Sequence, residues 1–520
     1  MRDSTRCVHI ERGSSESPGR RSGLLRRADP RRLLTHPQVA GLLSLGWLLM
    51  RTGLRPSRLS YPCQQAALST GLLLVVAPLV AMLAAARRRV RAGAFTGFGV
   101  AVVALGVFIA LASWGHGVAD RGRGIEKLLP PADHRSRVFH VTDCPAERDG
   151  DHFPGLENLI DLMGRNGLKF YRSATTSRLG GPDGIIGADD VVVVKINYQW
   201  SQRGGTNVDL LHGLVRAITA HPGGFTGEVV VCENAQFASV ANFDRPDNNA
   251  EDNQHSPYDV VVWFRDQGHR VSAFDWTDIR MTEVDEYSDG DDEPGYVVYP
   301  YDGDLGGRVS YPKFETEFGT KISLRDGVWE DSDQSYDNER LTFINLPVLK
   351  SHHSTYGVTA CVKNYMGVVT DSLATNSHNA IRYGVLGALL AEIGTADLNI
   401  LDCIWVNANP HTGPRTSYGG ATRRDELIAS TDPIAADIWA TTHILVPAFI
   451  ANGYASPWPY PSADPDDSES AFRTYLDNSM THLLAAGHGV TNDLQQIDVI
   501  SGDSARLRPA PRPAVRRAHP

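Results

Sequence analysis

The chain has 520 residues, of which 50 are Lys or Arg and 60 are Asp or Glu. The charges are unevenly distributed, because the first 115 residues contain 16 Arg, no Lys and four acids, whereas the remainder contains 34 basic and 56 acidic residues. A body with an excess of acids repels phosphate backbones, so no nucleic-acid partner is expected for it. The Arg clusters of the first part flank apolar runs, which is typical of a membrane protein rather than of a nucleic-acid-binding tail.

Two uncharged runs of 21 residues each, 66–86 and 94–114, predict transmembrane helices, because each is long enough to cross a bilayer core of ~30 Å. A shorter apolar run, 39–50, is either a third span or an interfacial segment. With three spans, the N-terminus and the Arg-rich turn at 87–91 both lie in the cytoplasm, as the positive-inside rule requires. The sequence therefore predicts an integral protein of the cell membrane, partnered by the lipid bilayer, with its large domain outside the cytoplasm.

The composition divides the chain into five parts of different character. These are a basic tail (1–36), a transmembrane region of two to three helices (37–115), a linker (116–135), a soluble α/β domain (136–505) and a Pro- and Arg-rich tail that is expected to be disordered (506–520). No two of the six cysteines have the CxxC spacing of a zinc or iron–sulfur site. A built-in iron–sulfur cluster is therefore not expected, and the identity of any cofactor stays open, with a divalent metal as one possibility.

The soluble part alternates short β-branched runs with helical patterns, which predicts an α/β fold. The expected strands are 191–198, 228–232, 341–346, 398–404, 426–430 and 497–500, and the expected helices are 208–220, 356–366, 380–393 and 433–444. Continuous Val and Ile runs indicate strands that are covered on both faces. We therefore expect a mostly parallel or mixed sheet with helices on both faces, preceded by the N-terminal transmembrane helices. An acidic stretch at 284–304 lacks the spacing of a calcium loop and is interpreted as a solvated surface insertion.

Polar side chains follow the first two of these strands at their carboxyl ends. The strand VVVVKINY carries Lys195 and Asn197, and the next strand runs into Glu233. Between them, Thr206 begins a Thr-x-x-Asp capping box that opens a helix, with Asn207 beside it. Open α/β sheets bind ligands beyond the carboxyl ends of their strands. The sequence therefore predicts that Lys195, Asn197, Asn207 and Glu233 bind a ligand.

The stretch richest in reactive side chains is INLPVLKSHHSTYGVTACVKNYMG, at residues 344–367. Lys350 and Lys363 follow a buried strand and could together clamp a phosphate or a carboxylate. His352 could act as an acid or base near neutral pH, or as a metal ligand. We therefore interpret Lys350, His352 and Lys363 as catalytic residues, and Asn345 and Asn364 as ligand-binding residues.

Two acids in the C-terminal half are further candidates. Asp402 lies inside an apolar strand, where a buried carboxylate needs a partner such as a lysine of the preceding stretch. Asp432 precedes Pro433 and could cap a helix or face the ligand, and Asp437 lies one turn farther along that helix. We therefore include Asp402 and Asp432 among the ligand-binding residues.

These stretches resemble a known family, the domain of unknown function 362 family. The resemblance covers residues 191–445, and its most specific part is an Asn-x-Pro-x-x-Lys-x-His pattern followed by Lys-Asn-x-x-Gly. The pattern falls on Asn345, Pro347, Lys350, His352, Lys363, Asn364 and Gly367, and a Ser-Thr-Asp-Pro pattern falls on residues 430–433. Some members of that family carry ferredoxin-type cysteine motifs, which implies redox or iron–sulfur work, but this chain lacks those motifs.

Three functions are compatible with these residues. The first is an enzyme or ligand-processing domain in which Lys and His side chains bind and polarise a small anionic molecule. The second is a metal-dependent or iron–sulfur-associated redox partner domain, with His352, Glu233, Asp402 and Asp432 as possible N and O ligands. The third is a non-catalytic binding or scaffold module at the membrane. We take the first as the main hypothesis, while the reaction and the substrate stay open.

Overall fold

The computed structural model describes residues 128–236, 243, 251, 254–454 and 461–503. The predicted transmembrane helices and the C-terminal tail lie outside these residues, so the membrane anchor stays a prediction. The chain divides into two units, 1–118 and 119–520, and every described residue belongs to the second. Among the described residues, one helical stretch, Pro433–Ala451, is long and apolar enough to cross a membrane, but 67% of it is buried within the domain. Such burial is typical of a core helix.

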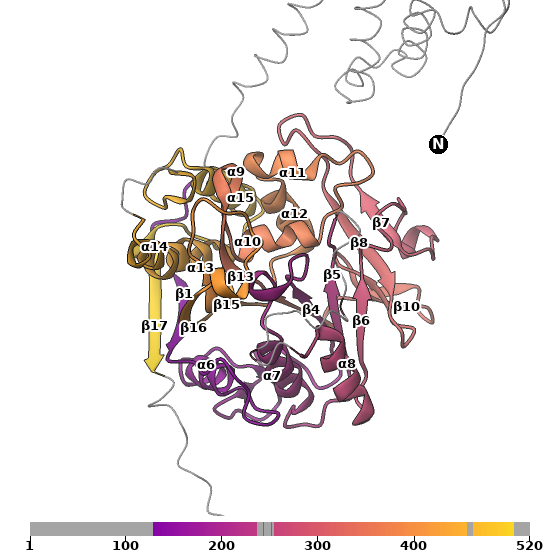
Figure 1. Ribbon diagram of the computed structural model, residues 1–520. Helices are drawn as coiled ribbons and strands as arrows, with labels where there is room; N and C mark the ends of the chain where they lie inside the picture. The colour runs from indigo at the N-terminus through magenta and orange to yellow at the C-terminus, as the bar shows by residue number, and fades with distance from the viewer. Residues whose placement is uncertain (1–127, 237–242, 244–250, 252–253, 455–460, 504–520) are drawn as a thin grey trace, which may run out of the picture. The chain divides into compact units, whose positions relative to one another are not determined.

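A ten-stranded mixed sheet forms the centre of the described domain (Figure 1). Its strand order is β17 (Ile497–Asp503), β1 (Ser136–Thr142), β16 (Thr422–Ser430), β15 (Leu398–Asn407), β12 (Leu341–Leu346), β4 (Val191–Ile196), β5 (Glu228–Glu233) and β6 (Val271–Asp275). Strands β15, β12, β4, β5 and β6 are parallel to one another, whereas β16 is antiparallel to both of its neighbours. The remaining two strands, β13 (Val348–His352) and β14 (Gly357–Thr359), extend the sheet beyond the end of β12.

Helices cover both faces of this sheet, as predicted. One face packs on α6 (Pro154–Arg165), α7 (Val208–Thr219) and α8 (Pro257–Asp266), which lie together at the bottom of Figure 1. The other face packs on α10 (Cys361–Asn364), α12 (Val385–Ile393), α13 (Pro433–Ala440) and α15 (Ala471–Ala485). Three further short helices are α9 (His353–Tyr356), α11 (Ser377–Ala380) and α14 (Val446–Ala451).

The valine runs are continuous because each strand contributes to two cores. In β4, Val191 and Val193 belong to the core on one face, and Val192 and Val194 belong to the core on the other. Side chains alternate across a strand, so a strand that is covered on both faces needs an apolar residue at every position. All six expected strands are present, and the mixed α/β sheet is confirmed.

One expected helix is wrong. The stretch 356–366 was expected to be a single helix, but it forms β14, the single turn of α10 and a short 3-10 turn, Tyr365–Gly367. Gly357 has a φ of +72°, and a side chain at this position would overlap the backbone of Ser462. The chain then extends through β-branched Val358 and Thr359, which pair with β13. The left-handed glycine and this pairing therefore break the helical pattern.

The acidic stretch 284–304 is more ordered than a surface insertion. It leads into a second sheet of five antiparallel strands within the described residues. These strands are β7 (Gly295–Val298), β8 (Ser310–Glu315), β9 (Lys321–Ser323), β10 (Gly327–Glu330) and β11 (Ser335–Asp337), and a small pair is formed by β2 (Tyr171–Arg172) and β3 (Gly180–Gly181). Glu286 is only 3% exposed, because its carboxylate accepts hydrogen bonds from Tyr311, Tyr336 and Ser323. The other acids of the stretch are at least partly solvated.

Candidate functional site

A cavity of about 220 Å³ opens beyond the carboxyl ends of β4 and β5, beside β13 and α10. This is the edge at which parallel α/β sheets place their ligands. The described residues that line it are Asn197, Gln199, Trp200, Glu233, Asn234, Gln236, Lys350, His352, Thr359, Lys363, Asn364, Met366, Gly367, His378 and Pro414. The structure therefore brings six of the predicted site residues to one cavity wall.

Lys195 and Glu233 form a buried ion pair beneath the cavity. Nζ of Lys195 donates to Oε2 of Glu233 at 2.8 Å and to Oδ1 of Asn364 at 3.1 Å. The two side chains are 0% and 2% exposed. Burial raises the pKa of Glu233 to about 7, and it lowers the pKa of Lys195. Lys195 was predicted to contact a ligand, but it lies under the wall and positions Glu233 and Asn364.

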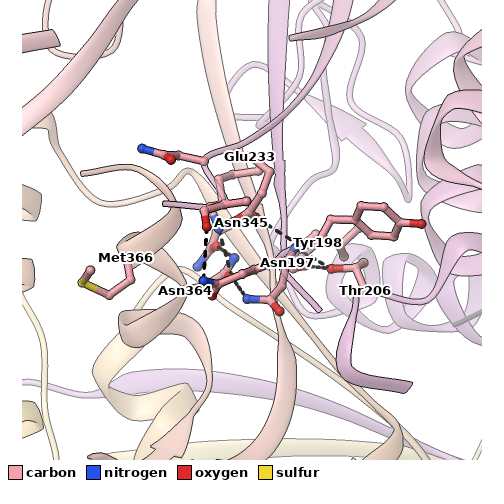
Figure 2. Close-up of polar contacts among 12 residues, drawn as sticks. Asn197, Tyr198, Thr206, Glu233, Asn345, Asn364 and Met366 are labelled. Atoms are coloured by element: carbon pink, nitrogen blue, oxygen red, sulfur yellow. Dashed lines mark hydrogen bonds and ion pairs between the residues drawn. The ribbon is translucent and has the colours of Figure 1, made fainter. Parts of the chain in front are cut away.

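Three asparagines tie the strands to α10 (Figure 2). Nδ2 of Asn197 donates to Oδ1 of Asn364 at 2.8 Å, and Nδ2 of Asn364 donates to Oδ1 of Asn345 at 2.8 Å. Asn345 in turn donates to the carbonyl oxygen of Cys361. Asn345 is not among the residues that line the cavity. Its hydrogen bonds therefore hold the neighbouring wall residues in position, and its own side chain does not face the cavity.

Lys350 is held at the cavity by two neutral oxygens. Its Nζ donates to Oδ1 of Asn197 at 2.5 Å and to the carbonyl oxygen of Gly204. The residue is 1% exposed, and burial lowers the pKa of its amine well below the ordinary value. The charge of Glu233 opposes this lowering of the pKa, whereas the charges of Lys363 and Lys195 add to it. An ammonium at this position therefore lacks a carboxylate at hydrogen-bond distance among the described residues, which favours an anionic ligand.

Lys363 is held in a different way. Its Nζ lies 4.4 Å from the centroid of the Tyr356 ring, and it has no hydrogen-bond acceptor among the described residues. Lys363 is 4% exposed, and burial, followed by the charge of Lys195, lowers its pKa to about 7. A cation–π contact stabilises an ammonium less than a carboxylate does. Near pH 7 this amine is therefore divided between its charged and neutral forms.

Two histidines complete the cavity wall on either side of Tyr356. Nδ1 of His352 lies 2.6 Å from Oγ1 of Thr359, and Nδ1 of His378 lies 2.9 Å from Oδ2 of Asp371. A carboxylate at Nδ1 orients an imidazole for proton transfer at its other nitrogen. His378 was missed in the sequence, because it lies in a short helix far from the motif and its position depends on the path of the chain.

Asn207 and Asp402 lie behind the cavity wall. The carboxylate of Asp402 accepts hydrogen bonds from the backbone N–H groups of Asn207 at 3.1 Å and Ile404 at 3.0 Å. Asn207, rather than Thr206, caps α7, because the hydroxyl of Thr206 donates to the carbonyl oxygen of Leu346. Burial raises the pKa of Asp402 to about 6. These predicted ligand-binding residues therefore anchor the loop after β4 and do not line the cavity.

Asp432 and Asp437, at the start of α13 and within it, also stabilise the backbone. Asp432 caps α13 by accepting from the N–H groups of Ile434 and Ala435, and it does not line the cavity. Asp437 accepts from the N–H groups of Cys361 at 2.6 Å and Val362 at 3.0 Å. These bonds hold the first turn of α10, the element that carries Lys363. Asp437 therefore acts on the cavity through the backbone.

Gly367 has no room for a side chain. A methyl group at this position would overlap Oε1 of Glu233 and Nζ of Lys195. We expect Gly367→Ala to lower the free energy of unfolding by roughly 1–3 kcal/mol, as overpacking of a filled core does. Denaturant unfolding of the variant checks this expectation. Gly420→Ala is the control, because a methyl group there meets only the hydroxyl of Ser417, and equal stability of the two variants would contradict the expected overlap.

Within the described ranges, no group of three or more His, Cys, Asp or Glu side chains is placed to hold a metal ion. Of the four ligands considered for a metal, His352 and Glu233 line the cavity, whereas Asp402 and Asp432 are engaged with backbone N–H groups. The four described cysteines, Cys144, Cys232, Cys361 and Cys403, are buried and are not in disulfides.

Residues 339–442 match the family model described as Domain of unknown function (DUF362). The matched segment contains Asn345, Lys350, His352, Lys363 and Asn364, so the resemblance is confirmed over the part of the chain that carries its most specific pattern. Strands β4 and β5, which carry Lys195 and Glu233, precede the matched segment. No curated protein and no solved structure matches the chain.

Proposed function

We propose that the domain binds a small oxyanion, a phosphate or a carboxylate, in the cavity beyond β4 and β5. The observation that carries this proposal is an excess of lysine amines over carboxylates at the cavity wall. Lys350 and Lys363 line the cavity, whereas Glu233 is the one carboxylate among its described lining residues and is paired with Lys195. Two buried amines without a counter-ion favour an anionic ligand, because the anion stabilises their charged forms.

Lys350 and Lys363 are held in different ways and would contribute differently to ligand binding. Lys350 is fixed by Asn197 and Gly204, so its remaining N–H bond has a defined direction. Burial lowers the pKa of Lys350 well below its ordinary value, and a bound anion raises that pKa again, so Lys350 gains a proton when the anion binds. Lys363 approaches the cavity from α10. His352 and His378 also line the cavity, and an imidazole ring can donate or accept a proton. The side chains that line the cavity could therefore catalyse a reaction of the ligand as well as bind it. The anchor predicted for residues 37–115 would hold this domain at a membrane.

Binding of phosphate, sulfate, acetate and pyruvate to the purified full-length chain tests the proposal. We expect Lys350→Met to weaken the binding of the preferred anion at least ~10-fold, since a hydrogen bond to a charged group contributes roughly 1.5–3 kcal/mol. Isothermal titration calorimetry in two buffers of different ionisation enthalpy also measures the expected proton uptake.

Lys169→Met is the matched control for this titration. Nζ of Lys169 donates to the carbonyl oxygens of Gly164 and Arg178, away from the cavity, so this variant should bind as the wild type does. The proposal fails if none of the four anions binds, or if Lys350→Met and Lys169→Met bind them equally well.

A further inference from the structure

The chain uses arginine for nearly all of its positive charge. Of its 50 basic residues only seven are lysines. Three of the seven, Lys195, Lys350 and Lys363, lie at or directly beneath the cavity, and no arginine is among its described lining residues. Arginine carries its charge at every accessible pH, whereas a buried lysine can lose its proton and act as an amine. The concentration of lysines at this site therefore suggests chemistry that needs an amine and not only a positive charge.

The three lysines differ in the groups that their Nζ atoms contact. Lys195 donates to a carboxylate, and Lys350 donates to two oxygens. Lys363 contacts the face of Tyr356 and lies in the low-dielectric wall with no acceptor among the described residues. Burial and a nearby cation, Lys195, lower its pKa to about 7, so a large fraction is neutral amine at physiological pH. These are the conditions under which a lysine becomes a nucleophile toward a carbonyl group.

We propose that Lys363 forms an imine with a small 2-oxo acid whose carboxylate is bound by Lys350. This proposal rests on the oxyanion-binding function proposed above and narrows its ligand to a carboxylate that carries a neighbouring carbonyl group. The cavity has a volume of about 220 Å³, which is sufficient for a compact molecule such as pyruvate.

Imine formation requires proton transfers, which groups at the cavity wall can carry out. The neutral Nζ of Lys363 attacks the carbonyl carbon and a C–N bond forms as the C=O π bond breaks. The nitrogen then loses one proton and the carbonyl oxygen gains one, which gives a neutral carbinolamine. A second protonation of that oxygen releases water and leaves a protonated C=N bond, so the net reaction consumes the amine, the carbonyl group and one proton. His378, which Asp371 orients, and His352, which contacts Thr359, are placed to carry these protons. The product keeps a positive charge beside the carboxylate.

Borohydride trapping on the purified full-length chain tests the proposal. The chain is incubated with pyruvate and reduced with sodium borohydride, which converts an imine into a stable secondary amine, and the modified lysine is located by peptide mass spectrometry. We expect modification of Lys363 well above that of Lys169 and Lys321, and an increase with pH through about 7, as the neutral amine accumulates. Lys363→Arg should abolish the trapping, because arginine keeps the charge but cannot form the imine.

Two comparisons separate the imine from simple binding. Lys350→Met should reduce trapping at least tenfold at a fixed low pyruvate concentration, and acetone, which lacks a carboxylate, should trap far less than pyruvate. If pyruvate binds in the calorimeter but Lys363 stays unmodified, the imine proposal is overturned while oxyanion binding stands. Modification of Lys350 or Lys195 instead of Lys363 would overturn the assignment of the nucleophile. Equal trapping by acetone would overturn the assignment of a carboxylate substrate.

Discussion

Glu233→Ala is expected to lower the free energy of unfolding by roughly 3–5 kcal/mol, the effect of removing one partner of a buried ion pair. The carboxylate of Glu233 accepts the 2.8 Å hydrogen bond of Lys195 and a 3.3 Å hydrogen bond from the backbone N–H of Tyr198. Without it, Lys195 would keep its ammonium in a fully buried position, because its Asn364 contact is to a neutral oxygen. Denaturant unfolding of the full-length wild type and variant measures the difference.

A double variant distinguishes the stability that is lost with the ion pair from the stability that is lost with the side-chain volume. Glu233→Gln with Lys195→Met removes both charges and keeps both side chains near their original size. We expect it to lose much less stability than Glu233→Ala, because no unpaired charge remains. Equal losses in the two proteins would mean that packing, rather than the charge of Lys195, controls this part of the core.

Lys363→Met is expected to have the opposite effect and to raise the free energy of unfolding by roughly 1–4 kcal/mol. Methionine keeps the length of the side chain and its contact with Tyr356, but it removes a buried amine without a carboxylate partner. A buried amine of this kind lowers the stability of the fold, as is common for groups that serve binding or catalysis. The same variant should fail to form the trapped imine, so a gain in stability would accompany a loss of reactivity.

The gain from Lys363→Met should depend on pH. The pKa of Lys363 falls from its ordinary value of 10.5 to about 7 in the folded domain, so between these values the unfolded chain binds more protons than the native one. Wild-type stability therefore rises with pH in this window through Lys363, and the advantage of the variant is full below pH 7 and disappears toward pH 10.5. Thermal unfolding of both proteins across this range measures the difference, and a constant difference would contradict the lowered pKa.

Six strands of the central sheet were predictable because their signal is local. A run such as VVVV in β4 needs an apolar environment on both faces, whichever helices supply it. The helix expected at 356–366 failed for a reason that no local pattern carries. Gly357 adopts a left-handed conformation, and the backbone of Ser462, about a hundred residues later, leaves no room for a side chain there. The five antiparallel strands after β6 were also missed, since they are short and their apolar positions are few.

For the candidate site, the sequence was enough to predict side chains that share one cavity wall, among them Lys350, Lys363, Asn197 and Asn364. Polar residues at the ends of buried strands are rare enough to predict a shared crevice, and Lys350, Asn197 and Glu233 do line one cavity. The sequence could not divide the residues into those that face the cavity and those behind it. Asp402 and Asp432 are, like Glu233, acids beside apolar residues, yet only Glu233 lines the cavity. The carboxylates of Asp402 and Asp432 instead accept hydrogen bonds from the N–H groups of a loop and of a helix.

The chemical character of the three lysines depends on contacts between distant segments. Residue type and spacing establish an α/β sheet with amines at its carboxyl edge, because alternation along a strand and the polarity of its end are local properties. The protonation of those amines depends on which acceptor each one meets. Lys195 meets Glu233 from the next strand, whereas Lys363 meets only an aromatic ring among its described neighbours, and His378 joins them through the packing of α11. Burial and partners belong to the folded arrangement, so only that arrangement distinguishes a paired lysine from a reactive one.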